Sequence, residues 1–164
     1  MQLTSLKAHQ PNGNPAGQMN HYTIDLSVES TASGVQTDTS CSALWGDNGL
    51  DAVGTYSRNA PTEWLPCNNP HFQFQLGPQY TIGNFDLSIR ETYIVQANQK
   101  TIQETYGITL KNDTSIPDYT CKIDVQDIPR IVHSSGDCTL AAGKALYVNV
   151  TDVCGGGVNS CVPS

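Results

Sequence analysis

The chain has 164 residues, of which 38% are hydrophobic and only 14% are charged, and this size suits one domain with a single core. Fifteen acidic and eight basic residues give a formal net charge of −7, and no basic run breaks the excess, which argues against nucleic-acid binding. No apolar run approaches the ~20 residues that span a bilayer, so no membrane partner is expected.

Alternating apolar and polar residues predict β-strands through most of the chain. The pattern is clearest at 22–28, where Tyr22, Ile24, Leu26 and Val28 fall on one face. A less regular strand is predicted at 2–9, and a loop rich in turn residues follows it. Further strands are predicted at 41–45, 71–76, 83–95, 101–110, 119–125, 130–133, 138–140 and 144–150, with Ser134–Asp137 forming a turn.

Two glutamates interrupt the predicted inward faces of neighbouring strands. Glu91 follows Phe85, Leu87 and Ile89 in the inward parity, and Glu104 occupies the equivalent position in the next strand. A bare carboxylate in a core costs several kcal/mol. Either a bulge shifts the register or the strand leaves the core, and we expect exposure, with this hairpin projecting beyond the core.

No window has the period and caps of a helix, and no internal repeat is found. Short strands at this spacing are typical of an all-β fold, here a single-domain antiparallel β-sandwich or a closed β-barrel. We expect the domain to span residues 1–153, with 154–164 forming a Gly-rich tail tethered by a disulfide.

Six cysteines without a Cys-x-x-Cys pair favour disulfides over a zinc site. Fifteen pairings are possible, and we expect the sequential one: Cys41 with Cys67, Cys121 with Cys138, and Cys154 with Cys161. The sequons at Asn112 and Asn149 are candidate glycosylation sites. The chain begins without a signal peptide, so we expect a mature secreted protein with Met1 added for expression.

No catalytic constellation emerges from the polar residues. The four histidines are scattered without metal-ligand spacing, there is no Gly-x-Ser-x-Gly elbow, and all cysteines can pair. We therefore expect no enzyme, no metal and no cofactor. Glu63, Glu91 and Glu104 are the carboxylates to test if the protein were a glycoside hydrolase, although solvated strand carboxylates are the simpler interpretation.

The aromatic residues near the first predicted disulfide allow a second alternative. Trp45 shares the parity of Cys41 and is expected in the core, whereas Trp64, beside Glu63 and two prolines, is less clearly buried. Tyr56 and Trp64 could form a stacking platform for sugars. That would make the protein a carbohydrate-binding module.

Several motifs together resemble a known family. They are an opening strand, Tyr22-Thr-Ile-Asp-Leu-Ser-Val, Cys41-Ser-Ala-Leu-Trp45, Trp64-Leu-Pro-Cys67 with Asn-Asn-Pro-His-Phe-Gln-Phe, and Ile82-Gly-Asn-Phe-Asp-Leu-Ser-Ile-Arg. Over about residues 1 to 95 they are similar to the small secreted fungal proteins related to the Alternaria major allergen. The resemblance implies an extracellular β-barrel or sandwich without established catalysis, acting on host plants, with Cys41, Cys67 and Trp45 in structural roles.

The functional hypothesis is a non-enzymatic, secreted, effector-like or elicitor-like protein of the apoplast. We expect it to bind a host protein or a small ligand, as a monomer or weak homodimer. Candidate contact residues are Tyr56, Trp64, Glu91 and Glu104, because the irregular 46–64 loop and the projecting 91–104 hairpin are the segments that core packing explains least.

Overall fold

The computed structural model describes residues 1–11, 21–45, 60–95, 97–128 and 131–155. These ranges contain strands and connections, and no helix in them is long and apolar enough to cross a membrane. The strands are β1 (Gln2–Gln10), β2 (Tyr22–Ser30), β3 (Thr37–Trp45), β4 (Leu65–Pro66), β5 (Phe72–Leu76), β6 (Asn84–Val95), β7 (Lys100–Lys111), β8 (Tyr119–Ile128), β9 (Ile131–Leu140), β10 (Leu146–Tyr147) and β11 (Asn149–Gly155).

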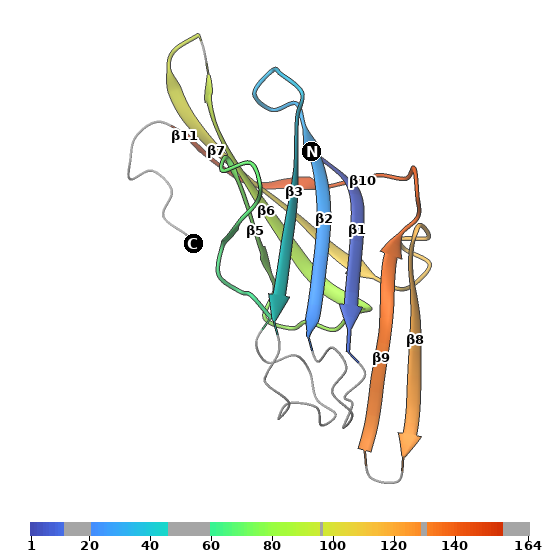
Figure 1. The fold of residues 1–164 in the computed structure, drawn as a ribbon. Helices are drawn as coiled ribbons and strands as arrows, with labels where there is room; N and C mark the ends of the chain where they lie inside the picture. Colours follow the sequence, from blue (N-terminus) through green and yellow to red (C-terminus); the bar gives the residue numbers. More distant parts are fainter. Residues whose placement is uncertain (12–20, 46–59, 96, 129–130, 156–164) are drawn as a thin grey trace.

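The strands form two antiparallel sheets that pack face to face. The first sheet has the order β3-β2-β1-β9-β8, with β10 also paired to β1, and the second has the order β11-β7-β6-β5-β4. Figure 1 shows the strands of the second sheet running obliquely behind those of the first. The all-β prediction is confirmed, and of its two forms the protein adopts the sandwich, because the sheets keep separate edges instead of closing into a barrel.

The core fills the space between the sheets. Strand β6 alternates as its sequence predicts, with Phe85, Leu87 and Ile89 buried and the residues between them more exposed. One end of the core is aromatic: Trp45, 8% exposed, stacks on Tyr22 with ring centroids 5.7 Å apart and meets the edge of Tyr80 at 5.1 Å. The core position expected for Trp45 is therefore confirmed.

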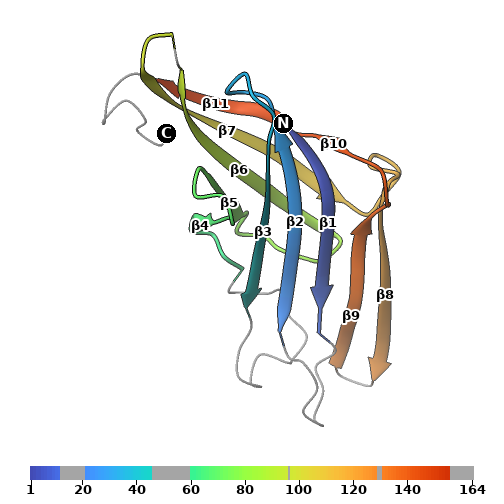
Figure 2. The same cartoon turned by 45° about the horizontal axis from the view of Figure 1, so that its top comes forward.

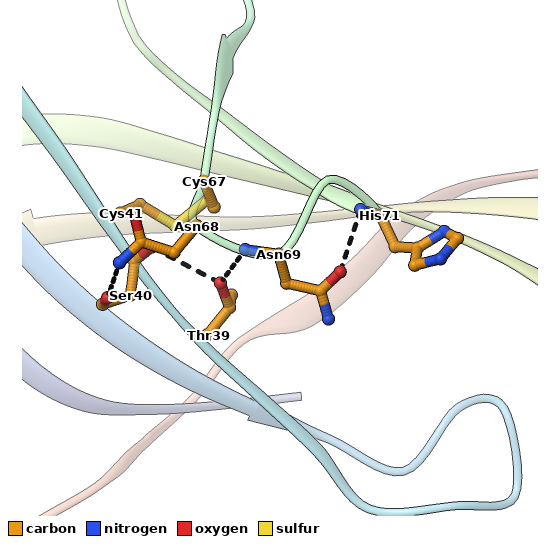
Figure 3. Close-up of a disulfide and its surroundings, with 7 residues drawn as sticks. All are labelled: Thr39, Ser40, Cys41, Cys67, Asn68, Asn69 and His71. Carbon is orange, nitrogen blue, oxygen red and sulfur yellow. Dashed lines mark hydrogen bonds between the residues drawn. A yellow bond between two sulfur atoms is a disulfide. The ribbon is translucent and has the colours of Figure 1, made fainter.

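The Cys41–Cys67 disulfide joins the two sheets (Figure 3). Cys41 lies in β3, at the edge of the first sheet, and Cys67 directly follows β4 of the second. Hydrogen bonds flank the bridge: the Asn68 side-chain amide donates to Ser40 Oγ at 2.6 Å, and the Asn69 backbone N–H donates to Thr39 Oγ1 at 2.9 Å. This edge of the sandwich is thus held by covalent and polar links together.

The second disulfide lies within one sheet. Cys121 of β8 and Cys138 of β9 are register partners, and their sulfurs are bonded. Two of the three predicted pairs are therefore confirmed. The third includes Cys161, which lies outside the described residues.

Several strand boundaries differ from the predicted ones: β3 begins at Thr37 and not at 41, and β8 ends at Ile128 and not at 125. Strand β9 runs without a break from Ile131 to Leu140 where a turn was predicted at 134–137, because it pairs with β8 along its whole length. Gly136 allows this pairing: a Cβ there would lie 2.3 Å from the carbonyl oxygen of Lys122. The segment predicted as one strand at 144–150 is two strands, β10 and β11, separated by the buried Val148.

That short separation carries the chain from one sheet to the other. Strand β10 pairs with the start of β1, and β11 pairs with β7. Figure 2 shows the two strands following one another along the upper edge of the sandwich. Strand pairing continues through Gly155, two residues beyond the predicted domain boundary at 153.

Candidate functional site

The two glutamates that interrupt the strand pattern face each other. Glu91 of β6 and Glu104 of β7 are register partners in an unbroken ladder, and such partners have Cβ atoms about 4.5–5.5 Å apart. The side chain of Glu91 is only 2% exposed. The expected bulge or exposure is therefore wrong for Glu91: the strand keeps its inward parity and places the carboxyl group between the sheets.

Hydroxyl groups from both sheets surround this pair of carboxyl groups. Ser30, at the end of β2 and itself 2% exposed, donates to Glu91 Oε2 at 2.5 Å. Tyr93 donates to Glu104 Oε1 at 2.9 Å, and Tyr106 donates to Glu104 Oε2. The Ser30 bond crosses from the first sheet to the second, which offsets part of the cost of burying Glu91.

The electrostatics of the cluster are set by burial and by the proximity of two acids. Burial raises the pKa of the Glu91 carboxyl group, the bond from Ser30 opposes this, and the charge of Glu104 raises it again; the chain's amino terminus and Thr37 lower it. Burial, together with hydrogen bonding to Glu104, raises the pKa of Tyr93 to about 12 and also raises that of Tyr106. The cluster therefore favours a protonated Glu91 with phenols that remain neutral.

The cluster links the two sheets through the bond from Ser30 to Glu91, and its geometry does not suit attack on a glycoside. A retaining glycosidase needs two carboxyl groups about 5–5.5 Å apart that both reach the sugar. Glu91 has no such access, because it is buried and Ser30 occupies one of its oxygens. Glu63, the third candidate acid, is exposed and precedes β4 by two residues, outside this cluster.

A second polar group lies on the outer face of the second sheet. Arg90 of β6 donates from Nε and Nη2 to Gln73 Oε1 of β5, at 3.2 and 2.6 Å. Its guanidinium carbon lies 4.1 Å from the centroid of the half-buried Trp64 ring. Trp64 is therefore neither a free stacking platform nor a core residue, since one face of its ring carries the guanidinium group.

A hollow of about 650 Å³ lies further along the same outer face. Its floor comes from β6 and β7 and its wall from the connection before β6. The lining residues are Pro78, Gln79, Thr81, Asn84, Phe85, Asp86, Thr109 and Lys111. Most of these side chains are polar and offer hydrogen bonds, and Pro78 and Phe85 add apolar surface to the hollow.

Exposed apolar side chains gather in the segment that changes sheets. Tyr147 is 74% exposed, Val150 51% and Val153 56%. Val150 and Val153 pair with Tyr106 and Glu104 of β7, so they continue the rows of side chains on the inner face of that strand. β11 is the last strand of its sheet among the described residues. This sheet edge therefore combines open apolar side chains with an outermost strand.

The remaining predicted residues are placed as follows. Glu104 is half-buried in the cluster instead of on a free surface. Asn112 and Asn149, the two sequon asparagines, are exposed. Tyr56 and most of the 46–64 loop lie outside the described residues. In the described part of the chain, no group of three or more His, Cys, Asp or Glu side chains lies close enough to hold a metal ion.

Several partners in these groups were not predicted from the sequence. Ser30, Tyr93 and Tyr106 contact the glutamates only because the sheets pack, and Arg90 meets Trp64 only because β4 and β5 pair. One signal was present: the apolar parity from Phe85 to Ile89 continues through Glu91 without a turn residue.

The fold and disulfides define a class of protein: a single two-sheet antiparallel β-sandwich fastened by cystines, with polar groups on its outer face and between its sheets. Comparison of the chain with family models, curated proteins and solved structures found no match.

Proposed function

We propose that the chain is a secreted, non-enzymatic protein of the effector or elicitor kind, which binds a host plant protein in the apoplast through β11. The resemblance to the Alternaria allergen-related proteins supports the plant context. The two disulfides support secretion, because such bonds persist mainly in oxidising compartments.

The observation that carries the proposal is β11, the outermost strand of its sheet in the described part of the chain. An edge strand can accept an extended segment of another protein by main-chain hydrogen bonding, with alternate side chains giving specificity. Val150 and Val153 supply open apolar contacts, and neither lysine nor proline guards the strand. The partner segment is therefore extended and apolar at alternate positions.

Charge favours a different protein over a second copy as the occupant. The chain carries −7 overall, and Asp152 is exposed within β11. A second copy pairing symmetrically about Asp152 would bring two carboxylates together, whereas a basic residue in the partner would complement it.

The test is infiltration of the purified protein into leaf apoplast, scored by the defence response, namely the oxidative burst and cell death. The Val150→Asp/Val153→Asp variant is expected to lose the response, because two carboxylates on β11 oppose an apolar partner. Val35→Asp is the matched control, since Val35 is 67% exposed in the β2–β3 turn. Thermal unfolding checks that all variants fold.

Three results contradict the proposal: a wild-type protein that elicits nothing, a β11 variant that elicits normally, and a Val35 control that loses the response equally. Hydrolysis of a polysaccharide, ester or peptide, abolished by a single Glu or Ser substitution, would contradict the non-enzymatic part.

A further inference from the structure

Arg90 is held by Gln73 and Trp64, and no carboxylate among the described residues pairs with it. Its guanidinium group is half-buried, and burial lowers its pKa. Among the described residues the ion pairs are His9 with Asp137 and Lys144 with Asp118, and neither includes Arg90. Partly desolvating a guanidinium group is costly unless an anion compensates. The chain has fifteen acidic residues, so a carboxylate beside Arg90 would be easy to supply.

The contacts of Arg90 orient its free edge. Arginine has five N–H donors, and the two bonds to Gln73 use one on Nε and one on Nη2. Both hydrogens of Nη1 and the second of Nη2 remain, and one hydrogen from each nitrogen can bind a carboxylate through two parallel bonds. Trp64 fixes the plane of the group from one side, so little rotamer freedom is left to lose on binding.

The surroundings of Arg90 favour a hydroxylated ligand over a peptide. Its neighbours on the outer face are Thr92 and Gln103, which are hydrogen-bonded to each other, and its register partner Thr105. Of the large exposed apolar residues, only Ile94 belongs to β5, β6 or β7, and it lies near the hairpin tip. Hydroxyl and amide side chains match the groups of a sugar, whereas apolar peptide side chains would find few contacts beyond the Trp64 ring.

The size of the face and its charge define the ligand further. The polar hollow includes Asp86, four residues before Arg90 in β6, and at about 3.3 Å per residue the two are roughly 13 Å apart, a span of about three sugar units. Asp86 and the exposed Asp152, which pairs with Thr105, repel a densely charged polyanion.

We infer that the outer face of the second sheet binds a saccharide of mainly neutral units that carries an isolated uronic acid, with Arg90 pairing its carboxylate and the hollow at Asp86 and Lys111 receiving neutral units. Gln73 and Trp64 are positioning residues, because they act through Arg90. This inference goes beyond the proposed function, in which β11 binds a host protein. The saccharide is a different ligand, and it binds on the outer face of the sheet and not at its edge.

The test is titration calorimetry with a neutral oligosaccharide carrying one glucuronic acid, compared with its methyl ester. Two charge-assisted hydrogen bonds predict at least ~10-fold tighter binding of the acid, with the difference shrinking as salt is added. Arg90→Gln removes both the charge and the planar fork, so it is expected to bind the acid and the ester within ~2-fold of each other.

Lys122→Gln is the charge-matched control, since it removes one positive charge from an exposed residue of β8 in the other sheet, and it is expected to keep the preference for the acid over the ester. Thermal unfolding checks the fold of each variant. The inference is overturned if the acid and the ester bind equally to the wild type, if neither binds, or if Lys122→Gln abolishes the preference as Arg90→Gln does. A short glutamate-containing peptide that binds as tightly as the saccharide acid overturns the assignment to sugars. The β11 variants keep saccharide binding, so the two proposals fail separately.

Discussion

Replacing Ser30 by alanine removes the hydrogen bond that joins the sheets at Glu91. Both residues are 2% exposed and the bond is 2.5 Å long, so no water replaces the lost hydroxyl group without entering the core. A buried polar group left without its partner costs about 1–3 kcal/mol. We expect Ser30→Ala to lower the free energy of unfolding by about 2 kcal/mol near neutral pH.

The loss should depend on pH, because Ser30 stabilises the ionised form of Glu91. The bond from Ser30 lowers the pKa of Glu91, against the larger effect of burial, which raises it. Removing the bond therefore raises that pKa further. The penalty of Ser30→Ala is smaller at acidic pH, where Glu91 is protonated in both proteins, and grows as the pH rises through the folded-state pKa.

Glu91→Gln tests the same linkage from the other partner. The pKa of Glu91 is higher in the folded protein than in the unfolded chain, where it is about 4.3. The protonated side chain therefore contributes its full share of stability below the unfolded pKa. That contribution is lost as the pH rises through the folded pKa. Glutamine keeps the shape but does not titrate. Stability of Glu91→Gln relative to the wild type should therefore increase between pH 4.5 and pH 8.

Urea unfolding followed by circular dichroism at several pH values measures both variants. Ser42→Ala, at an exposed position of β3, is the control and should change stability by less than about 0.5 kcal/mol. A Ser30→Ala penalty equal to that of the control, or one identical at pH 4.5 and pH 8, would refute this account of the cluster.

Three further predictions concern stability and are measured by urea unfolding. Replacing Cys41 and Cys67 by alanine should cost about 3.5 kcal/mol, the chain-entropy value for a sequence separation of 26; a loss below about 1 kcal/mol would show that packing alone holds this edge. Tyr119→Phe removes a buried 2.8 Å bond to the Ile82 carbonyl and should cost about 1 kcal/mol, and no loss would mean that the carbonyl finds another donor. Gly136→Ala places a Cβ against the backbone of β8 and should cost about 1–3 kcal/mol, and an unchanged stability would contradict the close strand contact.

The alternating residues of this chain determined its strands and the faces they bury. Phe72, Phe74 and Leu76 of β5 are buried as the period of two requires, because side chains of a strand point alternately to opposite faces. The two described disulfides were also predictable, since each closes a loop between neighbouring segments. Local chemistry thus sufficed for the strand pattern and for the all-β class.

Only tertiary structure decided which polar residues meet. Glu91 looked too costly to bury because its compensation comes from Ser30, 61 positions away, and no local pattern encodes that contact. The packing of two sheets brings them together, and the pairing of β4, β5 and β6 brings Trp64, Gln73 and Arg90 together. Strand periodicity acts over a few residues, whereas the partners of a buried or stacked charge are chosen by contacts between distant parts of the chain.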